Sequence, residues 1–227
     1  KVVYGGVLLP RKGVNFTNSQ LSIPSLTEKD IDDLNFGLLH NVEWIALSFV
    51  REANDIIQLK NIIRKEGKNS KVVAKIEKPE AIKNLDEVIS ESDAVMVARG
   101  DLGVELDLET VPILQKEIVR KCNHQTKPVI IATQMLESMI QSPTPTRAET
   151  NDVTNAVLDG ADAVMLSGET SVGKYPVKVV EYMRNIISTI ENESYPYNRH
   201  HAPEVTSPTF ISDSVCYNAC VMASQVG

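Results

Sequence analysis

The chain has 227 residues, of which 42% are hydrophobic and 23% are charged, a composition typical of globular proteins rather than of disordered or fibrous ones. Its 23 Lys and Arg residues and 30 Asp and Glu residues give a formal net charge of −7, which argues against a general binder of nucleic acid or of anionic membranes. Three cysteines without a CxxC pair predict free thiols in a reducing compartment. The apolar runs are far shorter than the roughly 18 residues that span a bilayer. We therefore expect a cytoplasmic protein.

The first predicted elements are a β-rich stretch before about residue 12 and a helix that begins after Thr27, where a threonine precedes acidic residues as in a helix N-cap. Further helices are expected to end at Gly67 and at Gly160, because glycine adopts the left-handed conformation that follows many helices. Trp44 and Phe49 are expected in the core.

Five apolar runs follow one another between residues 41 and 192, and each leads through polar residues into a helical stretch. The runs cover residues 44–50, 71–77, 93–98, 128–133 and 162–166. Continuous apolar strands that alternate with helices are typical of parallel sheets covered on both faces. The pattern predicts an α/β fold with about five βα units, in a barrel or a doubly wound sheet.

Two segments frame the end of the chain. Residues 193–209 are rich in proline and contain His200 and His201, and we interpret them as a linker with solvated histidines rather than as a metal site. Ser212 and Asp213 are predicted to cap a last helix. Because the chain starts at Lys1 rather than at Met and stops within this helical pattern, we expect it to be a piece of a longer polypeptide.

Polar residues lie at the carboxyl ends of the predicted strands, where barrels and doubly wound sheets place function. They are Lys75, Glu77, Arg99, Gly100, Asp101, Thr133, Gln134, Ser167, Gly168, Glu169 and Thr170. Lys75 and Glu77 are two residues apart, so their side chains project from the same side of a strand. One interpretation is an internal ion pair; the other is that Glu77 and Asp101 bind Mg²⁺, which prefers carboxylate and substrate oxygens.

Six motifs in series closely resemble those of the pyruvate kinase family. They are KGVN at 12–15, VAKIE at 73–77, VARGDLG at 97–103, ATQMLES at 132–138, PTRAE at 145–149 and MLSGET at 165–170. The resemblance implies a (β/α)8 TIM barrel, incomplete in this chain. It implies that residues 1–12 end an inserted lid domain, residues 13–192 form part of the barrel domain, and residues 210–227 begin a C-terminal domain.

The resemblance also implies an activity: phosphoryl transfer from phosphoenolpyruvate to ADP in glycolysis, giving pyruvate and ATP, with Mg²⁺ or Mn²⁺. By this resemblance Lys75 stabilises the transferring phosphoryl group, and Glu77 and Asp101 hold the metal. The backbone at Gly100 and Asp101 receives the substrate carboxylate, and Thr133 contacts the substrate and the proton route, with Ser167 as a neighbour of that route.

The family comparison implies that further parts lie outside the chain. They include three of the eight barrel strands and the ligands of K⁺, and the whole protein is expected to be a homotetramer. Residues 1–227 alone are therefore expected to be inactive. Two rival hypotheses stay open: an aldolase that forms a pyruvate enolate on a similar barrel, and a non-catalytic scaffold that retains the motifs.

Overall fold

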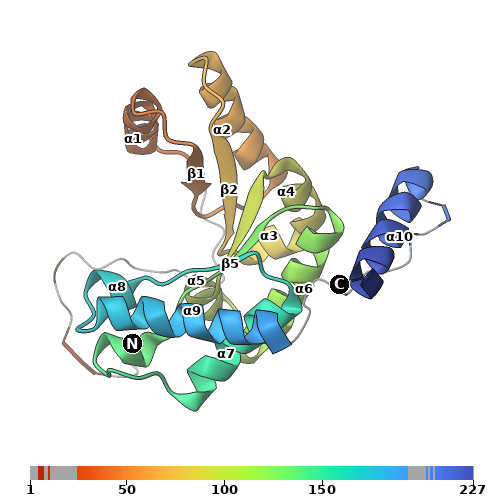
Figure 1. The fold of residues 1–227 in the computed structure, drawn as a ribbon. Helices are drawn as coiled ribbons and strands as arrows, with labels where there is room; N and C mark the ends of the chain where they lie inside the picture. Colours follow the sequence, from red (N-terminus) through yellow and green to blue (C-terminus); the bar gives the residue numbers. More distant parts are fainter. Residues whose placement is uncertain are drawn as a thin grey trace.

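One parallel sheet organises the protein. The computed structural model describes residues 5–7, 10, 25–193, 203, 205–206 and 208–226. The strands lie side by side in chain order (Figure 1): β1 (Trp44–Leu47), β2 (Lys71–Ile76), β3 (Ala94–Ala98), β4 (Val129–Ala132) and β5 (Ala163–Val164). Each strand overlaps one of the five predicted runs, so the prediction of about five βα units is confirmed. The arrangement is that of an incomplete TIM barrel.

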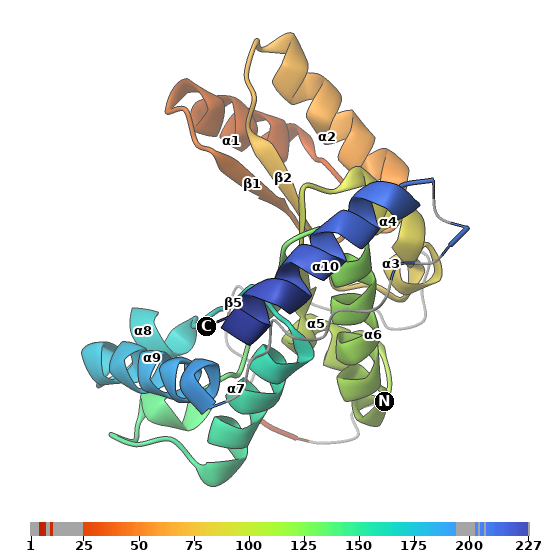
Figure 2. The ribbon, with the colours of Figure 1, turned by 45° about the vertical axis from the view of Figure 1, so that its right-hand side comes forward.

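Helices connect the strands and cover one face of the sheet. The longer ones are α2 (Ala53–Lys65), α6 (Val111–His124), α7 (Arg147–Asp159) and α9 (Pro176–Glu193), whereas α1 (Glu28–Leu39) precedes the first strand and α10 (Phe210–Val226) follows all of these elements. The shorter ones are α3 (Pro79–Lys83), α4 (Leu85–Glu91), α5 (Arg99–Glu105), α8 (Gly168–Ser171) and the 3-10 turns η1 (Leu108–Thr110) and η2 (Glu137–Ile140). Helices α2, α4, α6, α7 and α9 contact one another in this order, as expected for successive βα units (Figure 2). Within the described ranges, we find no helix with both the length and the apolar character that a bilayer crossing needs.

The two faces of the sheet have different surroundings because side chains alternate along a strand. Val72, Ala74 and Ile76 belong to the large core between sheet and helices. Val73 belongs to a second, smaller apolar cluster with Met96 and its neighbours, on the opposite face. Lys75 pairs in register with Met96, so its side chain shares this second face, which would be the interior of a closed barrel.

Aspartates hold the amino ends of two strands. Asp93, which precedes β3, accepts a hydrogen bond of 2.8 Å from the Val72 amide, and Asp162, which precedes β5, accepts one of 2.8 Å from the Val129 amide. Lys60 forms a 2.9 Å ion pair with Asp93. Although burial of the Asp93 carboxyl opposes ionisation, the bonds from Lys60 and Val72 outweigh it and lower the pKa of Asp93. The two aspartate–amide bonds tie the amino ends of neighbouring strands together.

Most predicted helix ends are confirmed. Thr27 caps α1 in a reciprocal capping box with Asp30. Gly67 and Gly160 have φ angles of +66° and +99° and follow α2 and α7 as predicted. The last helix differs, because α10 begins at Phe210, so that Ser212 and Asp213 lie inside its first turn rather than before it.

The prediction that Trp44 and Phe49 lie in the core is wrong, since they are 45% and 54% exposed. Trp44 starts the edge strand β1, and Phe49 has a φ of +56° at the other end of the same strand. Each ring lies near an ammonium group instead, Lys71 at 5.1 Å and Lys78 at 5.6 Å from the ring centroids. The predictions for most of residues 1–12 and for most of 193–209 fall outside the described residues.

Gly160 offers a test of the α7 end. A β-carbon there would lie 2.5 Å from Asn123 Nδ2, whereas one at Gly67 would meet nothing within 4 Å. Alanine in a left-handed conformation costs about 1–2 kcal/mol. We expect Gly67→Ala to lower the free energy of unfolding in urea by about 1 kcal/mol and Gly160→Ala by about 3 kcal/mol. Adding Asn123→Ala should recover part of the Gly160→Ala loss; equal losses at the two glycines would contradict the overlap.

Glu149 makes the stability of α7 depend on pH. Its carboxylate accepts bonds from the amide and hydroxyl of Ser138 at 2.6 Å each, and from the Thr146 amide at 2.7 Å. Burial opposes ionisation, but these hydrogen bonds outweigh it and lower the pKa of Glu149. The stabilisation is therefore present above the unfolded-state pKa of about 4.3 and is lost as pH falls through the lower folded-state pKa.

Glu149→Gln should accordingly lower the free energy of unfolding at pH 7, and the difference from the unsubstituted chain should shrink below about pH 4. Denaturant titrations at a series of pH values measure this difference. Glu117→Gln, on the exposed side of α6, is the control. A Glu149→Gln deficit that stays constant down to pH 3 would show that the charge of Glu149 is not its source.

Candidate active site

A buried ion pair lies at the carboxyl end of β2. Lys75 Nζ is 2.5 Å from Glu77 Oε1, and the Glu77 side chain is only 2% exposed. A buried carboxylate is costly unless it is paired and hydrogen-bonded. The interpretation of these residues as an internal ion pair is therefore confirmed, and the pair holds the Lys75 ammonium group at the sheet's carboxyl edge.

The neighbouring strand β1 supplies two more partners that the strand-end pattern did not include. Lys75 Nζ donates to Ser48 Oγ at 3.0 Å, and the Phe49 amide donates to Glu77 Oε2 at 2.7 Å. Both residues follow β1 directly, so extending the search for polar strand ends to the first apolar run would have found Ser48. Each oxygen of Glu77 thus has one partner, and the pair is fixed from two strands.

A second contact joins the ends of β3 and β4. The Gly100 amide donates to Thr133 Oγ1 at 3.2 Å. A β-carbon at residue 100 would lie 2.9 Å from that oxygen, so glycine permits the close approach. Because Ile76 pairs with Val97 and Ala98 pairs with Ala132, this contact lies at the same edge of the sheet as the Lys75–Glu77 pair.

Asp101 lies in the first turn of α5 and its side chain is exposed. Within the described parts of the chain, no group of three or more His, Cys, Asp and Glu residues is arranged to hold a metal ion. Two carboxylates are nevertheless a set that suits Mg²⁺, which keeps waters and takes further oxygens from a phosphorylated substrate. A carboxylate has about four lone-pair sites, so Glu77 retains acceptor capacity beside its two partners.

The turn after β5 is tied to the turn after β4. Glu169 is fully buried, and its carboxylate accepts bonds from the Leu136 amide at 3.2 Å and from the Ser167 amide at 2.8 Å. Ser167 Oγ lies 3.4 Å from the same carboxylate. Ser167 is thus placed at the carboxyl end of the sheet by Glu169, as its strand-end position predicts.

Backbone strain occurs at this edge of the sheet. Phe49 and Gln134 follow β1 and β4, and their φ angles are +56° and +54°. Non-glycine residues in such conformations are costly, but Asn41 and Thr126, which precede β1 and β4, have φ angles of +53° and +54°, so the strain is not specific to this edge. Lys78, which forms a 2.6 Å ion pair with Glu105, covers the exposed ring of Phe49 at the same edge.

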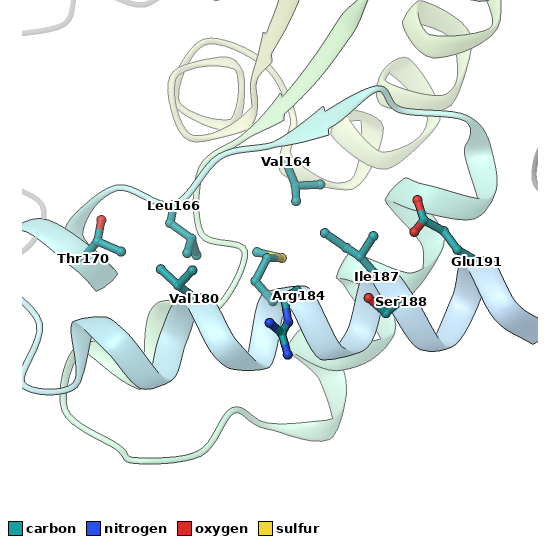
Figure 3. A pocket seen from close by; sticks show the side chains of 9 residues that line it. Val164, Leu166, Thr170, Val180, Arg184, Ile187, Ser188 and Glu191 are labelled. Atoms are coloured by element: carbon teal, nitrogen blue, oxygen red, sulfur yellow. The ribbon is translucent and has the colours of Figure 1, made fainter.

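An apolar groove lies elsewhere, between the β5 segment and α9. It has a volume of about 520 Å³, and of the predicted strand-end residues only Thr170 is among those that line it. Val164 and Leu166 face Val180 and Ile187 of α9 across it (Figure 3). With few polar groups converging on it, the groove is a packing surface beside the edge strand rather than the candidate active site.

Comparison with known proteins identifies the family. The family described as "Pyruvate kinase, barrel domain" matches residues 1–180. The chain is 52% identical over 215 residues to Pyruvate kinase 2 of Synechocystis sp., covering 95% of this chain and 36% of that protein. It is 50% identical over 199 residues to Pyruvate kinase PKLR of Rattus norvegicus, covering 88% and 34%.

A third relative, Pyruvate kinase of Thermotoga maritima, is 48% identical over 192 residues, covering 85% of this chain and 41% of that protein. The chain thus spans well under half the length of these curated relatives. The family match covers the five strands and every residue of the candidate site. The chain belongs to the pyruvate kinase family.

Proposed function

We propose that the carboxyl edge of this sheet is part of the active site of a pyruvate kinase. Such an enzyme transfers the phosphoryl group of phosphoenolpyruvate to ADP and yields pyruvate and ATP. The observation that carries the proposal is the buried Lys75–Glu77 pair, at the same sheet edge as the Gly100–Thr133 contact. This edge combines a fixed cation, two carboxylates and a backbone donor close to a hydroxyl. Family membership favours phosphoryl transfer over the aldolase hypothesis.

Lys75 supplies positive charge to the phosphoryl group in flight. Phosphoryl transfer requires alignment and electrostatic stabilisation more than covalent participation of the protein. Glu77 and Ser48 fix the ammonium group from two strands, so little reorganisation is needed when negative charge develops on the phosphoryl oxygens. The pair is therefore both the internal ion pair and part of the catalytic machinery.

Glu77 and Asp101 are the proposed ligands of Mg²⁺ or Mn²⁺. When bound, the divalent ion would neutralise negative charge on the phosphoryl and enolate oxygens. The backbone at Gly100 and Asp101 binds the substrate carboxylate, and the absence of a side chain at Gly100 gives that carboxylate room. Thr133 lies beside it through the 3.2 Å contact to the Gly100 amide.

Thr133 also belongs to the proposed proton route. Loss of the phosphoryl group leaves an enolate, whose methylene carbon takes up a proton to give pyruvate. The Thr133 hydroxyl can donate and accept a hydrogen bond, and Ser167 lies in the turn after the next strand, β5. By family resemblance we also propose K⁺ as an activator with ligands elsewhere in the protein, a homotetramer, and a cytoplasmic location.

A chimera tests the proposal. This chain replaces the matching segment of the Synechocystis relative, to which it is 52% identical over 215 residues, and pyruvate formation from phosphoenolpyruvate and ADP is measured. We expect turnover, and we expect Lys75→Met to lower kcat by about 10²–10³ while the KM for phosphoenolpyruvate changes little, because the charge acts mainly in the transition state.

Lys60→Met is the matched control for Lys75→Met. Lys60 is also a part-buried lysine in an ion pair, with a side chain 19% exposed against 24% for Lys75, but it binds Asp93 at the amino end of the sheet. Its kcat should stay near that of the unsubstituted chimera. A folded chimera without turnover would contradict the proposed function and favour the scaffold hypothesis. Equal losses of kcat in Lys75→Met and Lys60→Met would contradict the role assigned to Lys75.

A further inference from the structure

We infer that Arg99 is a positioning residue for the proposed reaction, which fixes Thr133 relative to Gly100 and Asp101. The inference rests on the proposed function. It concerns a residue that does not bind the substrate or the metal in that proposal, and whose side chain turns toward the helices instead.

The guanidinium group of Arg99 joins three parts of the fold. Nη2 donates to the Thr133 carbonyl oxygen at 2.6 Å and lies 2.9 Å from Met135 Sδ, both in the turn after β4. Nη1 donates to Asp152 on α7 at 2.8 Å and to Gln115 on α6 at 3.3 Å. One side chain that begins at the end of β3 therefore anchors the end of β4 to two helices.

Thr133 is consequently held from two directions by consecutive residues. Arg99 binds its carbonyl oxygen through the side chain, and Gly100 binds its hydroxyl through the backbone amide. Any shift of Thr133 relative to residues 100 and 101 must break one of these bonds. In the proposed reaction the same shift would move the Thr133 hydroxyl away from residues 100 and 101, which are proposed to bind the substrate carboxylate and the metal.

The chemistry of the arrangement requires arginine. The side chain is 12% exposed, and its planar fork directs two nitrogens toward different acceptors at once. Nε is buried without a hydrogen-bond partner among the described residues, a cost that native proteins rarely accept. In the orientation that binds Thr133 and Asp152, Arg99 therefore leaves the hydrogen-bonding capacity of Nε unused within the described part of the chain. Lysine, a single point charge on a flexible stem, cannot reproduce it.

A purely structural role would be to tie α6 to α7, and the chain offers a control for that role. Lys116 on α6 forms a 2.6 Å ion pair with Asp159 on α7. It connects the same two helices as the Arg99 contacts to Gln115 and Asp152. Lys116→Gln removes a helix–helix contact and leaves the turn after β4 untouched.

The first experiment measures amide hydrogen exchange by NMR in this chain. In Arg99→Lys the Gly100 amide is expected to exchange about tenfold faster or more, because Thr133 is released from one of its two anchors. The Ala74 amide in β2 should change less than about threefold, which shows that the fold is kept. In Lys116→Gln both amides should stay near their original rates. An unchanged Gly100 rate in a folded Arg99→Lys variant overturns the inference.

The second experiment measures kinetics in the chimera described above. Arg99→Lys is expected to lower kcat about tenfold or more, with a smaller change in the KM for phosphoenolpyruvate, because misplaced groups act chiefly on the transition state. Lys116→Gln should keep its kcat within about threefold. Equal effects of the two variants would overturn the inference and leave the proposed function intact. An inactive unsubstituted chimera would reject the proposed function, while the exchange rates would still decide the positioning of Thr133.

A second variant covers the case in which Arg99→Lys does not fold. Asp152→Asn keeps an acceptor oxygen for Nη1 but removes the charge that anchors the guanidinium group. Exchange at Gly100 about threefold faster or more, with a lower kcat, would support the inference. Values equal to those of Lys116→Gln would overturn it.

Discussion

The burial of the Glu77 carboxylate is the constraint on which the candidate site depends. A charged side chain that is 2% exposed must have partners, since an isolated ion in the protein interior is very unfavourable. The partners come from its own strand and from β1: Lys75, and the Phe49 amide. The contacts that stabilise the buried Glu77 carboxylate therefore also immobilise the Lys75 ammonium group. In the proposed phosphoryl transfer the same contacts serve stability and catalysis, because a fixed cation is what that reaction needs.

Parallel pairing extends this local arrangement to the neighbouring strands. Because β2, β3 and β4 are aligned in register, their last residues meet at one edge, and the side chain of Thr133 reaches the backbone of Gly100. The glycine at residue 100 is required for that approach, since a β-carbon would lie 2.9 Å from the hydroxyl oxygen. The site is thus assembled from strand ends that are far apart in the chain but adjacent in the sheet.

The sequence predicted the strands and helix ends well, because their signals are local. The capping threonine at residue 27 and the glycine at residue 160 act within one turn of helix. The exposure of Trp44 was not predictable in this way, because it depends on whether another strand covers β1, and hydrophobicity alone does not say so. The same holds for Arg99: its four acceptors come from three segments that only the fold brings together.

The polar residues at the two ends of the sheet have different physical roles. At the amino ends, Asp93 and Asp162 accept bonds from strand amides, and such bonds set the register of the strands. At the carboxyl ends, backbone amides donate to the side chains of Glu77 and Thr133, which the proposed reaction uses. A one-residue slip of β2 would turn Lys75 and Glu77 away from the barrel interior. The bonds of Asp93 and Asp162 that fix alignment at one end are therefore a condition for the chemistry proposed at the other end.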